Sequence, residues 1–260
     1  MTYNLAGKGS HPRPVWGRAA AGRLIFPGLV ILTAGAALAA GQSVSPIGLW
    51  VFVLVLGGWV ISLCLHEFGH AFLAHSGGDT SVRARGYLTL NPLKYTNTAM
   101  TFVIPVVILA IGGIPLPGGA VLIESHRLRS KAWQSTVSLV GPCVNLILGV
   151  LLTIAAHGVN NPLGYGLSFL ALLQFVTAIL NLLPVPGLDG FGVISPYLSE
   201  KTRAALRPIT PWAPLLLIVI LFSVPQAASV LFDAAGWLYH LCGGEQWAAA
   251  YGQNLFRFWR

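Results

Sequence analysis

One apolar segment dominates the chain: GLWVFVLVLGGWVISLCLHEFGHAFLA, at residues 48–74. Its only Asp, Glu, Lys or Arg is Glu67, and Gly77-Gly78 follows it closely. A helix needs about 20 consecutive apolar residues to cross a bilayer, so we expect this segment to be a transmembrane helix. The motif HEFGH near its end places ionisable side chains in a stretch otherwise suited to lipid, where such groups usually mark function.

The whole chain has the composition of a membrane protein. Of its 260 residues, 55% are hydrophobic and 8% are charged, whereas soluble domains have about 25% charged residues. The mean hydropathy is +0.73. The net charge is +8, but the cations fall in small groups between apolar runs, which argues against binding to nucleic acid. The three cysteines form no CxxC pair, so they predict neither a disulfide framework nor a thiolate metal site.

Five other apolar runs cover residues 24–40, 99–114, 133–156, 163–183 and 213–231. The run 99–114 is short and ends in GGIPLPGG, which is typical of turns. If it does not cross, 13 of the 15 Lys and Arg lie on one side, which the positive-inside rule makes the cytoplasm. We therefore predict an all-α polytopic membrane protein with about five to six transmembrane helices. A re-entrant helix or hairpin element, with a strand near residues 119–123, is expected after the HEFGH helix.

The sequence divides into three parts. Residues 1–23 are expected to be a basic cytoplasmic N-terminus, residues 24–231 a membrane-embedded domain with a core at about 48–195, and residues 232–260 an aromatic tail at the membrane interface. The basic leader and Ala37-Leu38-Ala39 also resemble a cleavable secretory signal, although the apolar run exceeds the usual length of about 15 residues. The loop 77–97 is predicted to hold a short hairpin that docks substrate, or else to contact anionic lipid. A compact chain of this kind suits a prokaryotic plasma membrane.

The HEFGH motif has the spacing of a zinc site. On a helix, His66 and His70 lie one turn apart on the same face, so both imidazoles can bind one zinc ion, with Glu67 beside them as a general base. A hydrolytic zinc site needs a third protein ligand and an open position. Asp189 is the strongest candidate, because it follows the run 163–183 through NLLPVPGLDG, whose prolines and glycines predict an unwound segment. The other carboxylates are Asp79, Glu124, Glu200, Asp233 and Glu245.

Three motifs together resemble the site-2 protease family of intramembrane zinc metalloproteases. They are HEFGH at residues 66–70, GPCVN at residues 141–145, and the pattern N-x-x-P-x-x-x-L-D-G at residues 181–190, in the family's order. The resemblance covers about residues 50–195. It implies that His66, His70 and Asp189 bind one Zn²⁺ per chain and that Glu67 is the general base.

The same resemblance implies a substrate site. Asn145 would line the cleft and help to hold the substrate strand, with Gly141, Asn181 and Pro184 also at the substrate site. The loops are too short for the PDZ-like insertion or CBS-type domain of larger relatives.

The predicted topology agrees with this ligand set. If residues 99–114 do not cross, the 48–74 helix carries both histidines toward the cytoplasm, and the 163–183 helix delivers Asp189 to the same side. If they crossed, Asp189 would emerge on the opposite face, about 30 Å away. Positive-inside counting and metal geometry therefore select the same model, in which the N-terminus and the opening of the site are cytoplasmic.

The expected function is intramembrane zinc proteolysis. The enzyme would hydrolyse peptide bonds within or near transmembrane helices of substrate proteins, as in regulated intramembrane proteolysis, with the lipid bilayer as its other partner. The alternative is a non-proteolytic protein that binds or transports zinc, since ligands inside a bundle can also serve permeation. A scaffold that keeps the motifs without activity is a third hypothesis. Glu67 separates these hypotheses, because hydrolysis needs a base that is not a metal ligand.

Overall fold

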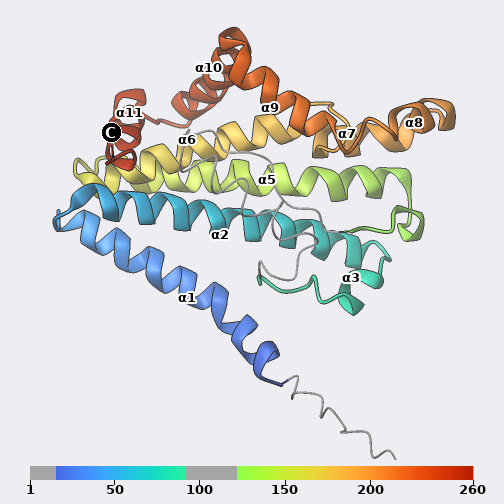
Figure 1. Cartoon of the computed structure of the whole chain (residues 1–260), viewed down its shortest axis with the longest axis horizontal. Coiled ribbons are helices and arrows are strands. Elements are labelled where there is room, and N and C mark those ends of the chain that lie inside the picture. Colours follow the sequence, from blue (N-terminus) through green and yellow to red (C-terminus); the bar gives the residue numbers. More distant parts are fainter. Residues whose placement is uncertain (1–15, 92–121, 260) are drawn as a thin grey trace, which may run out of the picture.

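The computed structural model describes residues 16–91 and 122–259, with side chains from residue 24. The described part of the chain contains helices and no strand (Figure 1). The α-helices are α1 (Trp16–Gly41), α2 (Ile47–Ser76), α3 (Ser81–Ala84), α5 (Lys131–Ala156), α6 (Pro162–Leu182), α7 (Asp189–Ile194), α8 (Glu200–Leu206), α9 (Ala213–Ser223), α10 (Pro225–Leu241) and α11 (Gln246–Phe256); η3 (Ser125–Arg127) and η4 (Ser195–Tyr197) are short 3-10 turns.

Four helices, α1, α2, α5 and α6, are long and apolar enough to cross a membrane, and the bent pair α9–α10 raises the number to as many as five. The all-α polytopic fold is thus confirmed, and the four spans predicted between residues 24 and 183 outside the run 99–114 each coincide with a helix. The run 99–114 and most of the strand expected at 119–123 lie outside the described residues. Leu122 and Ile123 belong to no regular element.

The predicted span 213–231 is interrupted by a sharp bend. The chain bends by 97° between α9 and α10, and Figure 1 shows the two helices as an inverted V beside α6. Pro225 explains the break, because proline has no backbone N–H to donate and disfavours helical backbone at the residue before it. Helix α10 then continues to Leu241, ten residues beyond the predicted boundary at residue 231.

The last helix packs into the bundle rather than lying free of it. Phe256 of α11 is fully buried, and its ring stacks on Phe52 of α2 with a centroid separation of 5.1 Å. It also contacts Phe169 of α6, at 5.5 Å between centroids. Other aromatic residues of the tail, including Trp247 and Trp259, remain exposed, as expected for a membrane interface.

The ends of α2 and α5 are joined so that the two helices run side by side (Figure 1). The indole Nε1 of Trp133 donates to the carbonyl of Leu73 at 3.0 Å. Gly77 makes this approach possible, because a Cβ there would lie 1.8 Å from the same Nε1 atom. Ser130 caps α5 by accepting from the backbone N–H of Trp133. This junction sets the register in which α5 faces the HEFGH turn of α2.

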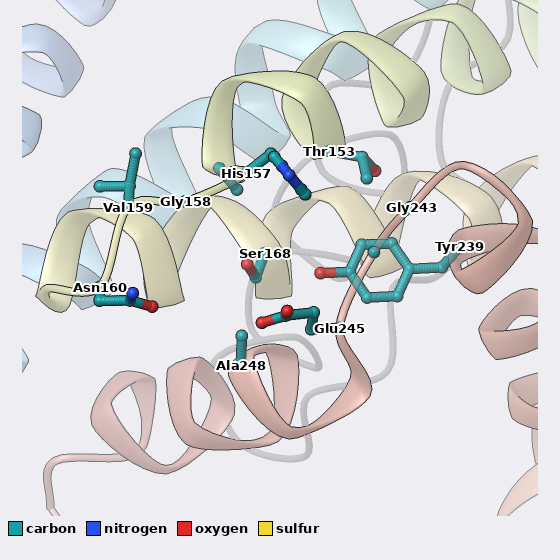
Figure 2. Close-up of a pocket in the computed structure, with 12 residues that line it drawn as sticks. Thr153, His157, Gly158, Val159, Asn160, Ser168, Tyr239, Gly243, Glu245 and Ala248 are labelled. Carbon is teal, nitrogen blue, oxygen red and sulfur yellow. The ribbon is translucent and has the colours of Figure 1, made fainter.

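A small pocket lies at the other end of the bundle, where the α5–α6 turn meets the α10–α11 turn. Figure 2 shows the Tyr239 hydroxyl pointing between Ser168 of α6 and Glu245. The cavity volume is about 20 Å³, which accommodates little more than one water molecule. This small pocket is therefore too narrow to hold a peptide.

Candidate metal centre

Three ligand atoms from two distant segments converge beside α5. The Nε2 atoms of His66 and His70 lie 3.1 Å apart, and Asp189 places its carboxylate oxygens 3.2 Å from the first and 3.4 Å from the second. With metal–ligand bonds of about 2.0 to 2.1 Å, the ligands of a tetrahedral zinc ion lie about 3.3 Å apart. The spacing of the three side chains therefore fits a single tetrahedral cation.

The hydrogen bonds behind the imidazoles favour a cation at this position. His70 Nδ1 lies 2.7 Å from the carbonyl oxygen of Val137, which can only accept, so this nitrogen carries the proton. His66 Nδ1 lies 2.6 Å from Asn145 Oδ1. Both Nε2 atoms consequently present lone pairs to each other and to a carboxylate. Asp189 Oδ2 is buried and has no hydrogen-bond donor, and a cation would satisfy all three groups at once.

Asp189 reaches the histidines because α6 unwinds before it. The helix ends at Leu182, and Pro184 prevents its continuation. Gly187 then adopts a φ of +95°, which turns the chain back toward the bundle. Gly190 permits the return, because a Cβ there would lie 2.1 Å from the carbonyl oxygen of Leu182. The unwound segment predicted from NLLPVPGLDG is present.

Gly141 is the point at which α5 comes closest to the ligands. A Cβ at this position would lie 2.3 Å from His70 Nε2 and 2.5 Å from His66 Nε2. Any side chain would therefore occupy the space between the ligand atoms. Glycine is required here by the close approach of the helix rather than by backbone conformation.

The ligands lie at the base of a cavity of about 510 Å³. Glu67 and Asn181 also line it, with exposed fractions of 3% and 6%. The cavity is large enough for several residues of extended peptide, and buried polar groups around an enclosed space are the usual signature of an active site.

Leu122 and Ile123 form the front wall of this cavity, and Asp79 holds them in place. The Asp79 carboxylate is completely buried and accepts from the backbone N–H of Glu124 at 2.7 Å and of Ser81 at 3.0 Å. Burial opposes its ionisation, but these hydrogen bonds outweigh burial and lower the pKa of Asp79 below its ordinary value. Within the described residues 77–91, Ser81–Ala84 form the short helix α3; the hairpin predicted in the loop 77–97 falls partly outside the described residues and stays a prediction.

Salt bridges add to the same junction. Arg85 donates to Glu124 Oε1 at 2.5 Å and to the carbonyl of Leu122 at 2.9 Å, and Arg127 pairs with the other oxygen of Glu124. The hydrogen bond from Arg127, followed by the charges of Arg127 and Arg85, lowers the pKa of the Glu124 carboxyl. We call Asp79, Arg85, Glu124 and Arg127 the charged clamp.

The structure separates the predicted substrate residues. Asn181 lines the cavity, and Gly141 faces the imidazoles. Asn145 is 1% exposed and contacts His66 from behind, while Pro184 is exposed beyond the end of α6. Their contact with substrate stays a prediction. His75, also on α2, lies outside the ligand cluster.

Two supporting groups were not found from the sequence. The Val137 carbonyl has no signature in the sequence, because every residue has a backbone carbonyl. Gln174, which accepts from Asn145 at 2.8 Å, left a weak signal. Gln174, Thr177 and Asn181 are spaced i, i+3 and i+7 within an apolar run, which places them on one helix face.

Sequence comparison finds relatives over most of the chain. A Mycolicibacterium smegmatis protein named as a zinc metalloprotease, Rip2, is 42% identical over 238 residues, which are 89% of this chain and 91% of that protein. Rip2 of Mycobacterium tuberculosis is 44% identical over 243 residues, with 90% and 93% covered. Bacillus subtilis YwhC, also named as a zinc metalloprotease, is 29% identical over 191 residues, with 66% and 81% covered.

No family model matches the chain, and no solved structure matches it. The apolar helices and these relatives together indicate an integral membrane protein.

Proposed function

We propose that this chain, which belongs to the site-2 protease family of zinc metalloproteases, hydrolyses peptide bonds inside the membrane. Its substrates would be membrane proteins cut within or near a transmembrane helix, as in regulated intramembrane proteolysis. His66, His70 and Asp189 are the proposed ligands of the one zinc ion, and Glu67 is the proposed general base.

The observation that carries the proposal is the depth of the ligand cluster along apolar helices. His66 and His70 lie ten and six residues before the end of α2, which is roughly 10 to 15 Å along the helix axis. Gly141 lies at a similar distance from the start of α5. A cleft that opens at this depth favours substrates that are themselves in the membrane.

The chemistry divides between the metal and one carboxylate. Zinc, when bound, lowers the pKa of water and polarises a peptide carbonyl. Glu67 lines the same cavity without belonging to the ligand cluster, so its carboxylate is available to take the proton from the attacking water. It then delivers this proton to the nitrogen of the leaving amine.

The substrate must be unwound to react. In an intact helix each peptide carbonyl accepts from the N–H four residues later, and the helix is about 10 Å wide. An extended segment fits the cavity better, so helix-breaking residues in the substrate are expected to favour cleavage. The positive-inside count supports a site that opens to the cytoplasm, from which water would reach it. The compact chain suits a prokaryotic plasma membrane.

The test compares two variants of the detergent-purified chain with the native protein. Glu67→Gln should retain about one zinc per chain, measured by elemental mass spectrometry, but lose cleavage of a transmembrane substrate reconstituted in vesicles. Asp189→Ala should lose both zinc and cleavage. A Glu67→Gln variant that still cleaves would refute the proposed role of Glu67. Zinc unchanged in Asp189→Ala would refute the ligand set, and zinc binding without cleavage in the native chain would favour zinc storage or transport.

A further inference from the structure

Gln174 is a polar side chain buried in the middle of an apolar helix. It belongs to α6, has an exposed fraction of 0% and does not line the cavity of the metal centre. Its Oε1 atom accepts a hydrogen bond from Asn145 Nδ2 on α5 at 2.8 Å. Gln174 Nε2 is buried and has no hydrogen-bond partner among the described residues. Burying such a donor is unfavourable, and an apolar residue of the same length would avoid it.

The hydrogen bond to Gln174 matches one of the two orientations of the Asn145 amide. An Asn side chain has an acceptor end and a donor end. Because Gln174 presents an oxygen, the NH₂ group of Asn145 faces α6, and its Oδ1 faces His66 Nδ1 at 2.6 Å. A reversed Asn145 would place two NH₂ hydrogens toward His66 and would leave its oxygen against another oxygen.

The orientation of Asn145 selects the tautomer of His66. An acceptor at Nδ1 keeps the proton on that nitrogen, so the lone pair is at Nε2, which faces His70 and Asp189. The reversed amide would favour the proton on Nε2, where it blocks a metal. His70 needs no such relay, because the Val137 carbonyl can only accept.

We propose that Gln174 is a positioning residue of the metal centre, which acts through Asn145 to orient His66 and hold it in the metal-binding tautomer. This inference rests on the ligand set given under Proposed function. It also explains why a polar side chain is buried at position 174, where an apolar residue would pack without an unsatisfied donor. A neutral acceptor also suits a position between apolar helices better than a carboxylate does.

The alternative is that Gln174 merely joins α5 to α6. A structural hydrogen bond would contribute to stability and leave zinc affinity unchanged. A positioning role predicts the opposite pattern. Removing the amide leaves the buried NH₂ of Asn145 without its acceptor but also removes the unsatisfied NH₂ of Gln174. These two effects offset each other, so stability should change little while zinc affinity falls.

The main experiment uses Gln174→Met in the full-length chain in detergent, because methionine preserves length without an acceptor. Zinc affinity is measured by competition with a chromophoric chelator, and stability by thermal unfolding of the zinc-free protein. Substitutions of groups that support a metal ligand directly weaken binding by about 10- to 100-fold. For Gln174, one step further away, we expect roughly a threefold to tenfold loss. Gln174→Leu serves if the methionine variant does not fold.

Two further variants make the result specific. Thr177→Val is the matched control, because Thr177 is buried on the same helix and its hydroxyl donates only to the Leu173 carbonyl of its own helix. It should bind zinc as the native chain does. Gln174→Glu keeps an oxygen for Asn145, with its buried carboxyl protonated and therefore neutral, and should restore most of the affinity. The cobalt(II)-substituted methionine variant should show altered visible absorption, which reports ligand geometry.

A double-mutant cycle with Asn145→Ala decides between the two roles. If Gln174 acts through Asn145, adding Gln174→Met to Asn145→Ala should cause no further loss of zinc affinity. The proposal is overturned if Gln174→Met binds zinc with native affinity, or if its effect is equally large without Asn145. Asp189→Ala is measured in parallel. Loss of zinc there with native affinity in Gln174→Met rejects only the positioning role, whereas native affinity in both rejects the ligand set as well.

Discussion

The cavity has two walls that use different chemistry to hold their residues. Behind the ligands, a glycine, two neutral amides and a backbone carbonyl position the imidazoles between apolar helices. At the front, the charged clamp fixes the segment that carries Leu122 and Ile123. Unpaired charge is expensive inside a bilayer, whereas exposed ion pairs outside it are individually weak and screened by salt. The back wall should therefore control metal binding, and the front wall should control the shape of the cleft under given solution conditions.

The largest effect is expected from Gly141→Ala in the back wall. The added Cβ would lie 2.3 Å from His70 Nε2, so α5 must move away or the metal must leave. We expect near-complete loss of bound zinc and of proteolysis, measured as zinc per chain and as substrate cleavage.

Gly69→Ala is the control for this substitution. Gly69 lies within the HEFGH motif, but its added Cβ would meet Val140 at 3.5 Å, an ordinary contact. This variant should keep its zinc. Equal zinc in both variants would show that the α5 helix is not held against the ligands.

A smaller effect on zinc affinity should distinguish the group that supports His66 from the group that supports His70. Asn145→Ala removes a side chain that supports His66, and zinc affinity should fall by about 10- to 100-fold. Val137→Ala keeps the backbone carbonyl that supports His70. It should leave zinc affinity nearly unchanged and lower the free energy of unfolding by about 1 kcal/mol through lost packing. Chelator competition measures zinc affinity, and chemical unfolding measures the free energy of unfolding. Equal losses of zinc affinity in Asn145→Ala and Val137→Ala would contradict this difference between the two histidines.

The sequence predicted the proposed metal ligands better than the groups that support them. The spacing of His66, Glu67 and His70 along one helix can be read from a short stretch of sequence. The proline and glycine residues before Asp189 likewise predicted the unwound segment. The packing of two helices against each other is not determined by the sequence of either helix alone. The roles of Asn145 and Gln174 therefore emerged only once α5 and α6 were packed together.

Two features of the structure lay beyond what hydropathy and loop composition could predict. Hydropathy alone treated residues 213–231 as one helix, although Pro225 marked the break. The hairpin predicted in the loop 77–97 falls partly outside the described residues, but the described part is held by Asp79, which accepts from the backbone of Ser81 and of Glu124. A buried carboxylate with partners so far apart along the chain cannot be recognised from the loop itself.

In the front wall, Asp79→Asn should have a moderate, pH-dependent effect. The lowered pKa of Asp79 means that its charged form stabilises the folded state. This contribution is fully present above the unfolded value of about 3.9 and disappears as the pH falls through the folded-state pKa. Hydrogen exchange of residues 122–128 should therefore be faster in the variant at pH 6, and the difference should shrink below about pH 4. A difference that persists in acid would show that charge is not responsible.

The smallest effect is expected from Glu124→Gln, which removes the ion pairs but leaves the hydrogen bond from Arg85 to the Leu122 carbonyl. At low salt, hydrogen exchange of residues 122–128 should be slightly faster in the variant than in the native chain. Raising the ionic strength toward about 1 M should remove this difference, because the Debye length falls to about 3 Å. Glu200→Gln is the matched control, since its pair with Arg203 is exposed and lies on α8, so it should not alter exchange at residues 122–128. An effect of Glu124→Gln that is independent of salt would mean that the front wall depends on hydrogen-bond geometry rather than on charge, and the contrast between the two walls would then be one of exposure alone.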